Sequence, residues 1–149
     1  MLILLRGLPG AVDYQKFTTL YNVDYVVSPW DFVEKKEMMV DKNKLHLLTG
    51  DSWKEAHNKC RTFIHKYLYA GKKIVCWFEF DKFYHLVEYK NIADSLNGEF
   101  IVIDVYDNGF TNYELIANAK SRNIYQNAIT NKYITKKKSS WHFTWQRIK

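Results

Sequence analysis

The residues with the clearest potential for chemistry lie near the start of the chain. A short apolar run leads into Gly7-x-x-Gly10, which is how a phosphate-binding loop of the form G-x-x-x-x-G-K-[ST] begins. In that motif the backbone amides cradle phosphates, the lysine reaches them and the Ser or Thr hydroxyl binds Mg²⁺. Here the positions of the second glycine, the lysine and the hydroxyl hold Val12, Asp13 and Tyr14.

These three replacements remove what a nucleoside triphosphate needs from such a loop. The Val12 side chain blocks close approach of a phosphate to the backbone, and Asp13 puts a negative charge where a cation is required. Tyr14 is a poor substitute for the small hydroxyl that binds Mg²⁺. The sequence therefore predicts a degenerate loop, and we expect no cofactor.

A second group of candidate residues follows the other predicted strands. Trp30 and Asp31 come after a strand at residues 24–27, and Trp77 and Glu79 come at the end of a strand at residues 73–78. In a parallel sheet ligands bind outside the carboxyl ends of the strands, so these side chains belong to the same edge as the loop. The aromatic rings either fill a cavity or form a surface for stacking or for protein binding. The two carboxylates are either a remnant acidic pair or, as isolated groups, solvated or salt-bridged.

The C-terminal tail, about residues 132–149, alternates basic and aromatic side chains. Its candidate nucleic-acid-binding residues are Lys132, Lys136, Lys137, Lys138, Trp141, Trp145 and Arg147. Cations for phosphates and planar rings for bases are what single-stranded nucleic acid binding requires. The alternative interpretation is an ordinary solvated chain end whose aromatic side chains pack on the core.

The histidines and cysteines do not suggest a metal site. His57 lies on a predicted helix, where we expect it to bond neighbouring backbone. The other four histidines share no spacing: His46, His65, His85 and His142. Cys60 and Cys76 lack the spacing of a metal site or a disulfide framework, and we expect two half-buried thiols in a reducing compartment.

Composition narrows the class of protein. The chain has 149 residues, 47% of them apolar, which fits one globular domain over residues 1–149. Its net charge of +6 makes anionic partners such as nucleic acid plausible. No apolar run is long enough for a secretory signal or a membrane span, so we expect a cytoplasmic protein without a membrane partner.

Strands and helices alternate along the chain. Strands are predicted at residues 2–5, 24–27, 73–78 and 100–105, and helices from Asp13, from Asp51 to Gly71, over 82–96, through Ala119 and over 123–133. The clearest helix has a capping box of Ser52 and Glu55, and its apolar stripe consists of Trp53, Ala56, Cys60, Phe63 and Tyr67. We expect Phe17 and Leu20 to face inward on the first helix, and the helix over 82–96 carries Leu86, Tyr89 and Ala93 on one face. Helical connections between strands indicate right-handed crossovers, and hence an α/β fold with a mostly parallel sheet flanked by helices.

Five blocks of the chain, in order, resemble the polynucleotide-kinase-like P-loop family, small kinases that phosphorylate the 5′ ends of nucleic acids. The blocks are Arg6-Gly7-Leu8-Pro9-Gly10, Ser28-Pro29-Trp30-Asp31-Phe32 at the acceptor motif, Glu55-Ala56-His57-Asn58-Lys59-Cys60 at a helix motif, Ile74-Val75 before an Asp-Asn-Thr-Asn motif, and Glu114-Leu115 before Lys120, where an Arg-rich lid begins. The resemblance implies a P-loop kinase-like three-layer sandwich.

The same resemblance implies that the family's chemistry is lost. The acceptor aspartate that takes the proton from the attacking hydroxyl falls on Trp30, and only Asp31 remains. The Asp-Asn-Thr-Asn segment falls on residues 77–80, and the lid arginines fall on Ala117 and Asn118. Phosphoryl transfer depends on positioning and on charge stabilisation by Lys, Mg²⁺ and Arg. We therefore expect a pseudokinase, with no catalytic residues and no metal, that binds nucleic acid or a nucleotide-like ligand.

Two other functions stay open. The first is a viral accessory protein, for example from a phage, whose aromatic surface binds a host or viral protein as an inhibitor or adaptor in the host cytoplasm. The second is a divergent nucleotide or polynucleotide kinase that is still active. The sequence does not define the oligomeric state.

Overall fold

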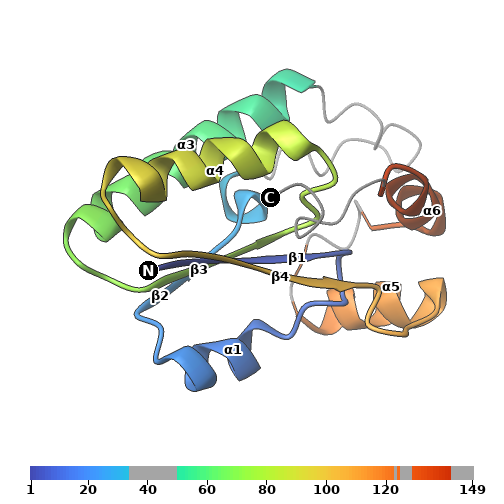
Figure 1. The fold of residues 1–149 in the computed structure, drawn as a ribbon. Coiled ribbons are helices and arrows are strands. Elements are labelled where there is room, and N and C mark those ends of the chain that lie inside the picture. The colour runs from blue at the N-terminus through green and yellow to red at the C-terminus, as the bar shows by residue number, and fades with distance from the viewer. Residues whose placement is uncertain (34–49, 123, 125–128, 142–149) are drawn as a thin grey trace.

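The core of the computed structural model is a parallel sheet (Figure 1). The structure describes residues 1–33, 50–122, 124 and 129–141. Within these ranges the strands are β1 (Leu2–Gly7), β2 (Tyr25–Val27), β3 (Ile74–Phe78) and β4 (Phe100–Tyr106), in the order β2-β3-β1-β4. Every neighbouring pair is parallel. The predicted α/β class with a mostly parallel sheet is therefore confirmed.

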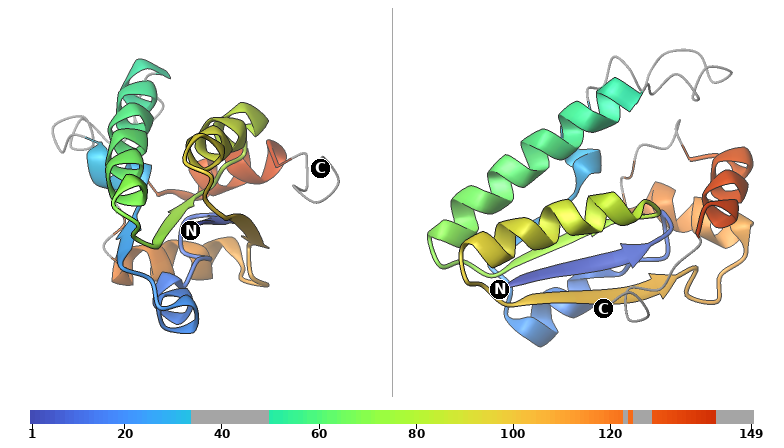
Figure 2. Two further views of the ribbon diagram at one scale, coloured as in Figure 1. Left: turned by 60° about the vertical axis from the view of Figure 1, so that its left-hand side comes forward. Right: turned by 45° about the horizontal axis from the view of Figure 1, so that its top comes forward.

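Helices cover both faces of this sheet, as Figures 1 and 2 show. One face carries α3 (Gly50–Tyr69) and α4 (Phe83–Ser95), and the other carries α1 (Tyr14–Tyr21) and α5 (Asn112–Ser121). A further helix, α6 (Asn131–Ser139), lies beyond the carboxyl ends of the strands. The arrangement is a three-layer sandwich, as the resemblance implies. None of the helices in the described ranges is both long enough and apolar enough to cross a membrane.

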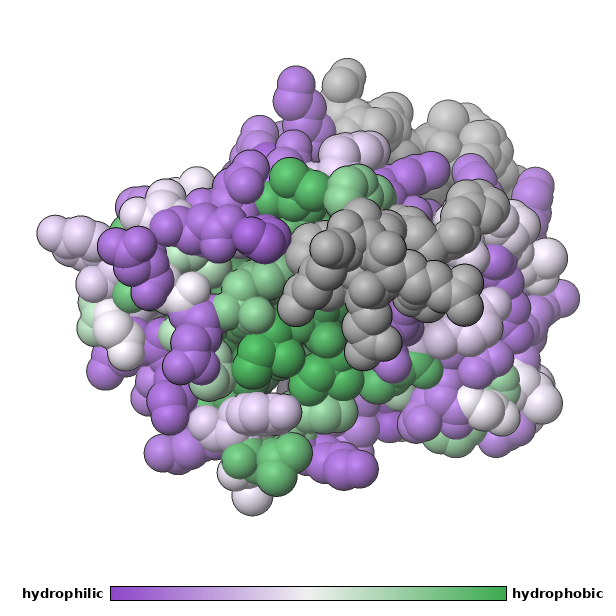
Figure 3. Space-filling view, viewed as in Figure 1, coloured by the Kyte–Doolittle hydropathy of each residue, from purple (hydrophilic) through white to green (hydrophobic). Residues whose placement is uncertain are grey.

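The burial of each strand follows from its position in the sheet. All residues of β1 and β3 are buried, because helices cover both faces and each strand has a neighbour on either side. In contrast, β4 pairs with β1 along one side, and its apolar side chains are only half-buried. Figure 3 shows apolar side chains gathered on the face that β4 crosses. Strand β4 is thus an edge strand within the described part of the sheet.

The bounds and buried faces of α3 and α4 agree in part with the sequence predictions. For α4 the prediction of residues 82–96 is confirmed, and the expected inner residues Leu86, Tyr89 and Ala93 are buried. In α3 the apolar stripe is confirmed, with Ala56 and Cys60 buried. This helix begins at residue 50, and the predicted capping box depends on a side chain outside the described part.

Two predictions about helices are wrong. Leu20 of α1 was expected to face inward, but it is 67% exposed, because α1 packs through Tyr14, Phe17 and Tyr21, spaced three and four residues apart. The expected helix over residues 123–133 is also wrong at its described residues, since 129 and 130 are not helical and α6 begins only after Thr130, while residues 123 and 125–128 lie outside the described part. The Thr130 side chain accepts a hydrogen bond from the Tyr133 amide and so starts the helix there.

Candidate functional site

The loop that follows β1 is packed closed. Residues 8–12 are all buried. Gly10 has φ +84°, and a Cβ built on it would lie 2.0 Å from the Leu115 carbonyl oxygen of α5. Helix α5 therefore contacts the loop backbone directly at Gly10, where only glycine fits.

Hydrogen bonds within the fold hold this closed loop. The Leu8 amide donates to the Tyr106 carbonyl over 2.9 Å, and the Ala11 amide donates to the Leu8 carbonyl over 2.9 Å. Arg122, at the end of α5, donates to the carbonyl oxygens of Gly10 and Val12. The loop thus presents carbonyl oxygens to a cation, whereas a phosphate site presents amides to an anion.

A cleft of about 310 Å³ adjoins the closed loop, and we call it the strand-end cleft. It is lined by Tyr14, Val26, Trp30, Asp31, Trp77, Arg122 and Ile124. The structure therefore brings together four of the residues singled out from the sequence. The rings of Tyr14 and Trp77 stack in parallel, with centroids 5.7 Å apart and planes inclined by 13°. Asp13 is exposed before α1, and its side chain does not cap that helix.

Trp30 behaves as a core residue. It is 2% exposed, and its ring packs edge-on against Trp53 at 4.9 Å and against Tyr133 at 6.0 Å. The nearby Phe78 and Phe80 are buried as well. At these positions the cavity-filling interpretation of the aromatic side chains holds, while Trp77 also forms a wall of the cleft.

The two candidate carboxylates take different partners. Asp31 accepts a hydrogen bond from the Ser28 amide over 2.9 Å, in a capping box that opens the short helix η1 (Pro29–Phe32). Partial burial raises the pKa of Asp31, against the opposing effect of that hydrogen bond. Glu79 is fully buried and accepts a hydrogen bond from the Tyr133 hydroxyl over 2.8 Å. The expected solvated or salt-bridged state is wrong for Glu79, whereas Asp31 is exposed to solvent as expected.

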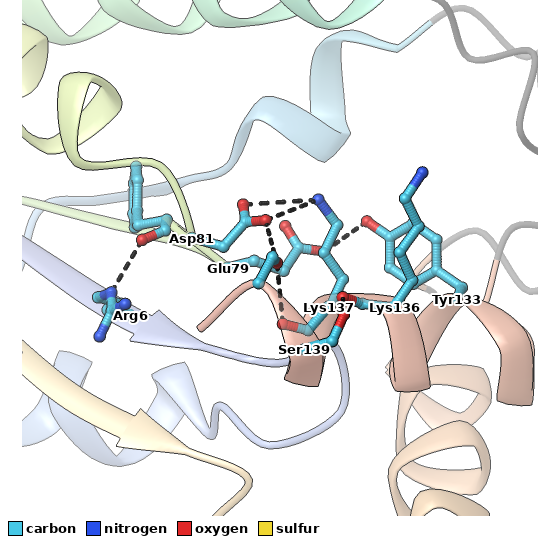
Figure 4. Close-up of polar contacts among 9 residues, drawn as sticks. Arg6, Glu79, Asp81, Tyr133, Lys136, Lys137 and Ser139 are labelled. Atoms are coloured by element: carbon cyan, nitrogen blue, oxygen red, sulfur yellow. Dashed lines mark hydrogen bonds and ion pairs between the residues drawn. The ribbon is translucent and has the colours of Figure 1, made fainter. Parts of the chain in front are cut away.

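Glu79 belongs to a buried polar cluster at the end of β3, formed with Asp81, Tyr133, Lys137 and Ser140 (Figure 4). Burial raises the pKa of Glu79 to about 7. Asp81 accepts hydrogen bonds from Ser140 Oγ at 2.7 Å and Lys137 Nζ at 3.3 Å. Although burial acts in the opposite direction, Lys137 and Ser140 hold the pKa of Asp81 below its usual value.

This cluster changes the interpretation of the basic tail. Lys137 is turned toward Asp81, whereas Lys136 points away from it (Figure 4). Trp141 covers the buried Arg6, whose guanidinium carbon lies 3.8 Å from the ring centroid. Lys132 and Lys136 are exposed and Lys138 is half-buried on α6, while Trp145 and Arg147 lie outside the described residues.

A pair of stacked histidines lies on the α3 and α4 side of the sheet. The rings of His57 and His85 are 4.1 Å apart between centroids. His57 Nδ1 shares a hydrogen bond with the Tyr89 hydroxyl at 2.9 Å, so the expected bond to neighbouring backbone is wrong. Burial lowers the pKa of His57 to about 2 and that of His85 to about 4. The sequence signal for this pair is that each histidine falls on the inner stripe of its helix.

The two cysteines also lie together. Their Sγ atoms are 3.9 Å apart, and both thiols are free and fully buried, so the expected half-buried state is wrong. Burial raises the pKa of Cys76, which keeps this thiol protonated and unreactive. In the part of the chain that the structure describes, no three His, Cys, Asp or Glu residues form a group that could hold a metal ion.

No protein-family model matches the chain, and a search of curated proteins finds no significant match. The resemblance to polynucleotide kinases therefore rests on the five sequence blocks and on the three-layer fold.

Proposed function

We propose that the chain is a kinase-like fold without phosphoryl-transfer activity, which binds single-stranded nucleic acid or a nucleotide-like ligand at the strand-end cleft. The observation that carries this proposal is the contrast between two neighbouring features. The loop that would hold a triphosphate is packed against α5 at Gly10, while the adjoining cleft keeps a pair of stacked rings.

The electrostatics of the loop argue against catalysis. The lysine position holds Asp13, and the nearby Arg122 already donates to two loop carbonyls. Asp31 is engaged in capping η1. In phosphoryl transfer a single arginine accounts for about 10³–10⁵ in rate, so the combined loss of lysine, metal site and lid arginines leaves no useful turnover.

The cleft suits a planar ligand better than a phosphate chain. Stacking of a base on an aromatic side chain contributes about 1–3 kcal/mol per base without regard to sequence. The net charge of +6 adds attraction for a phosphate backbone, and Lys132 and Lys136 are exposed on α6. Both features favour a ligand made of bases and phosphates.

Binding of single-stranded oligonucleotides to a Tyr14→Ala variant tests this proposal. The expected result is affinity that falls steeply with salt and is about 5–150-fold weaker in the variant, since one stacked base is lost. Tyr113→Ala is the matched control, because Tyr113 also lies in the first turn of a helix and is 82% exposed away from the cleft. Equal binding by the two variants, or Asp31-dependent transfer of phosphate to a 5′-hydroxyl, would contradict it.

A second candidate function is binding of a protein, and the outer edge of β4 favours it. This strand has half-buried apolar side chains and pairs on one side only in the described sheet. An extended segment of a partner, such as the host protein expected for a viral inhibitor, would add there as a further strand. A partner that protects the β4 amides from hydrogen exchange supports this function, and protection only elsewhere contradicts it.

A further inference from the structure

A second pocket lies on the opposite face of the sheet from the strand-end cleft. Trp77 lines the cleft and Phe78 lines this pocket, and consecutive strand residues point to opposite faces. The pocket has a volume of about 380 Å³ and lies between α3, α4 and α6. We call it the histidine pocket, because His57 and His85 form part of its wall. Its size falls within the range of small-molecule sites.

The walls of the histidine pocket carry a surplus of positive charge. Its charged residues are Lys54, Arg61, Lys82 and Lys137 against Asp81 and Glu88. Arg61 pairs with Glu88 at 2.6 Å, and Lys137 pairs with Asp81 at 3.3 Å. Lys54 and Lys82 form no ion pair within the described ranges. Two ammonium groups therefore remain for an anionic ligand.

Two imidazole nitrogens in this wall lack a partner. His57 is 1% exposed, and its Nε2 has no hydrogen-bond partner among the described residues. The same holds for Nδ1 of His85. A buried polar atom left unsatisfied is destabilising, so a native fold usually supplies a partner for it. Here a bound ligand is the group that would supply it.

The N-terminus of α4 opens on the same pocket. Tyr84 and His85 of its first turn line the pocket, as does the preceding Lys82. No side chain caps this helix, and its first turn has no acidic residue. The first-turn amides and the helix dipole together favour an anion at such a terminus.

We propose that the histidine pocket binds a phosphate monoester of mononucleotide size. The phosphate would lie at the N-terminus of α4 between Lys54 and Lys82, beside the wall that His57 and His85 form. Trp53 and Tyr84, which also line the pocket, would contact the planar part of the ligand. This site is independent of the strand-end cleft, so it does not depend on the proposed function.

Titration with adenosine 5′-monophosphate, followed by calorimetry and by the NMR signals of the histidine rings, tests this site. We expect binding that shifts the signals of His57 and His85, and about tenfold or greater weakening in Lys82→Met, because a charge-assisted hydrogen bond is lost. Lys72→Met is the matched control, since Lys72 is an exposed lysine outside the pocket.

Three results would overturn the proposal. The first is the absence of binding to the wild-type protein, and the second is equal weakening by Lys82→Met and Lys72→Met. The third is binding that Tyr14→Ala abolishes while Lys82→Met leaves it unchanged, because the ligand then occupies the strand-end cleft. Inorganic phosphate serves as a second probe. Affinity equal to that of the nucleotide would overturn the mononucleotide assignment, and weaker binding would support it.

Discussion

Replacement of Gly10 by alanine tests whether the loop is closed by α5. The new Cβ would meet the Leu115 carbonyl oxygen at 2.0 Å, whereas ordinary contacts begin at 3.4 Å. The residue also has φ +84°, which costs an L-amino acid about 1–2 kcal/mol. Overpacking against backbone adds about 1–3 kcal/mol, so Gly10→Ala should lower the free energy of unfolding by about 2–5 kcal/mol.

A matched control separates the clash from the backbone strain. Gly71 has φ +81°, and a Cβ added there would have nothing within 4 Å, so Gly71→Ala should show only the strain of about 1–2 kcal/mol. Urea unfolding followed by tryptophan fluorescence measures both variants, provided that the slope with denaturant is unchanged. If Gly10→Ala and Gly71→Ala destabilise the protein equally, α5 does not pack on the loop, and the loop is not closed to a triphosphate.

Three further outcomes are expected from the buried charged and titratable groups. The pKa values of His57 and His85, about 2 and about 4, lie below the unfolded value of 6.5. Their contribution to stability is therefore full above pH 6.5 and is lost as the pH falls through 6.5 toward 4. Urea unfolding across this range should show that loss of stability, and constant stability would contradict the expectation. Glu79 has the opposite sign, because its pKa is raised from 4.5 to about 7 and its contribution is lost as the pH rises between these values. The unfolding free energy of Glu79→Gln relative to that of wild type should therefore rise by up to about 3 kcal/mol between pH 5 and pH 8 in the same urea assay. A difference between the two proteins that does not change with pH would refute this expectation. Arg6 is fully buried and pairs with the more exposed Asp104 at 2.5 Å, so Asp104→Ala, which leaves the buried guanidinium without this carboxylate, should cost about 1–3 kcal/mol in thermal unfolding, and addition of Arg6→Met should recover part of this loss. Strict additivity of the two substitutions would show that the pair does not interact.

The sequence was sufficient to predict the elements whose signal is local. The apolar runs that became β1 and β3 predicted strands, and the spacing of Leu86, Tyr89 and Ala93 was enough to place the inner face of α4. The alternation of these elements predicted the parallel sheet, because helical crossovers return the chain in the same direction. The same local patterns failed for Leu20 and for the start of α6, where packing and a single threonine cap decide.

The closed loop and the contacts at the candidate site depend instead on tertiary packing. The sequence showed that lysine and hydroxyl are missing after Gly10, but α5 closes over the loop from a hundred residues away, and Arg122 binds its carbonyls from there. The contacts between His57 and His85, and between Lys137 and Asp81, likewise join separate elements. Such contacts depend on how helices are set on the sheet, whereas spacing within one element indicates only which face a residue occupies and not which partner it meets.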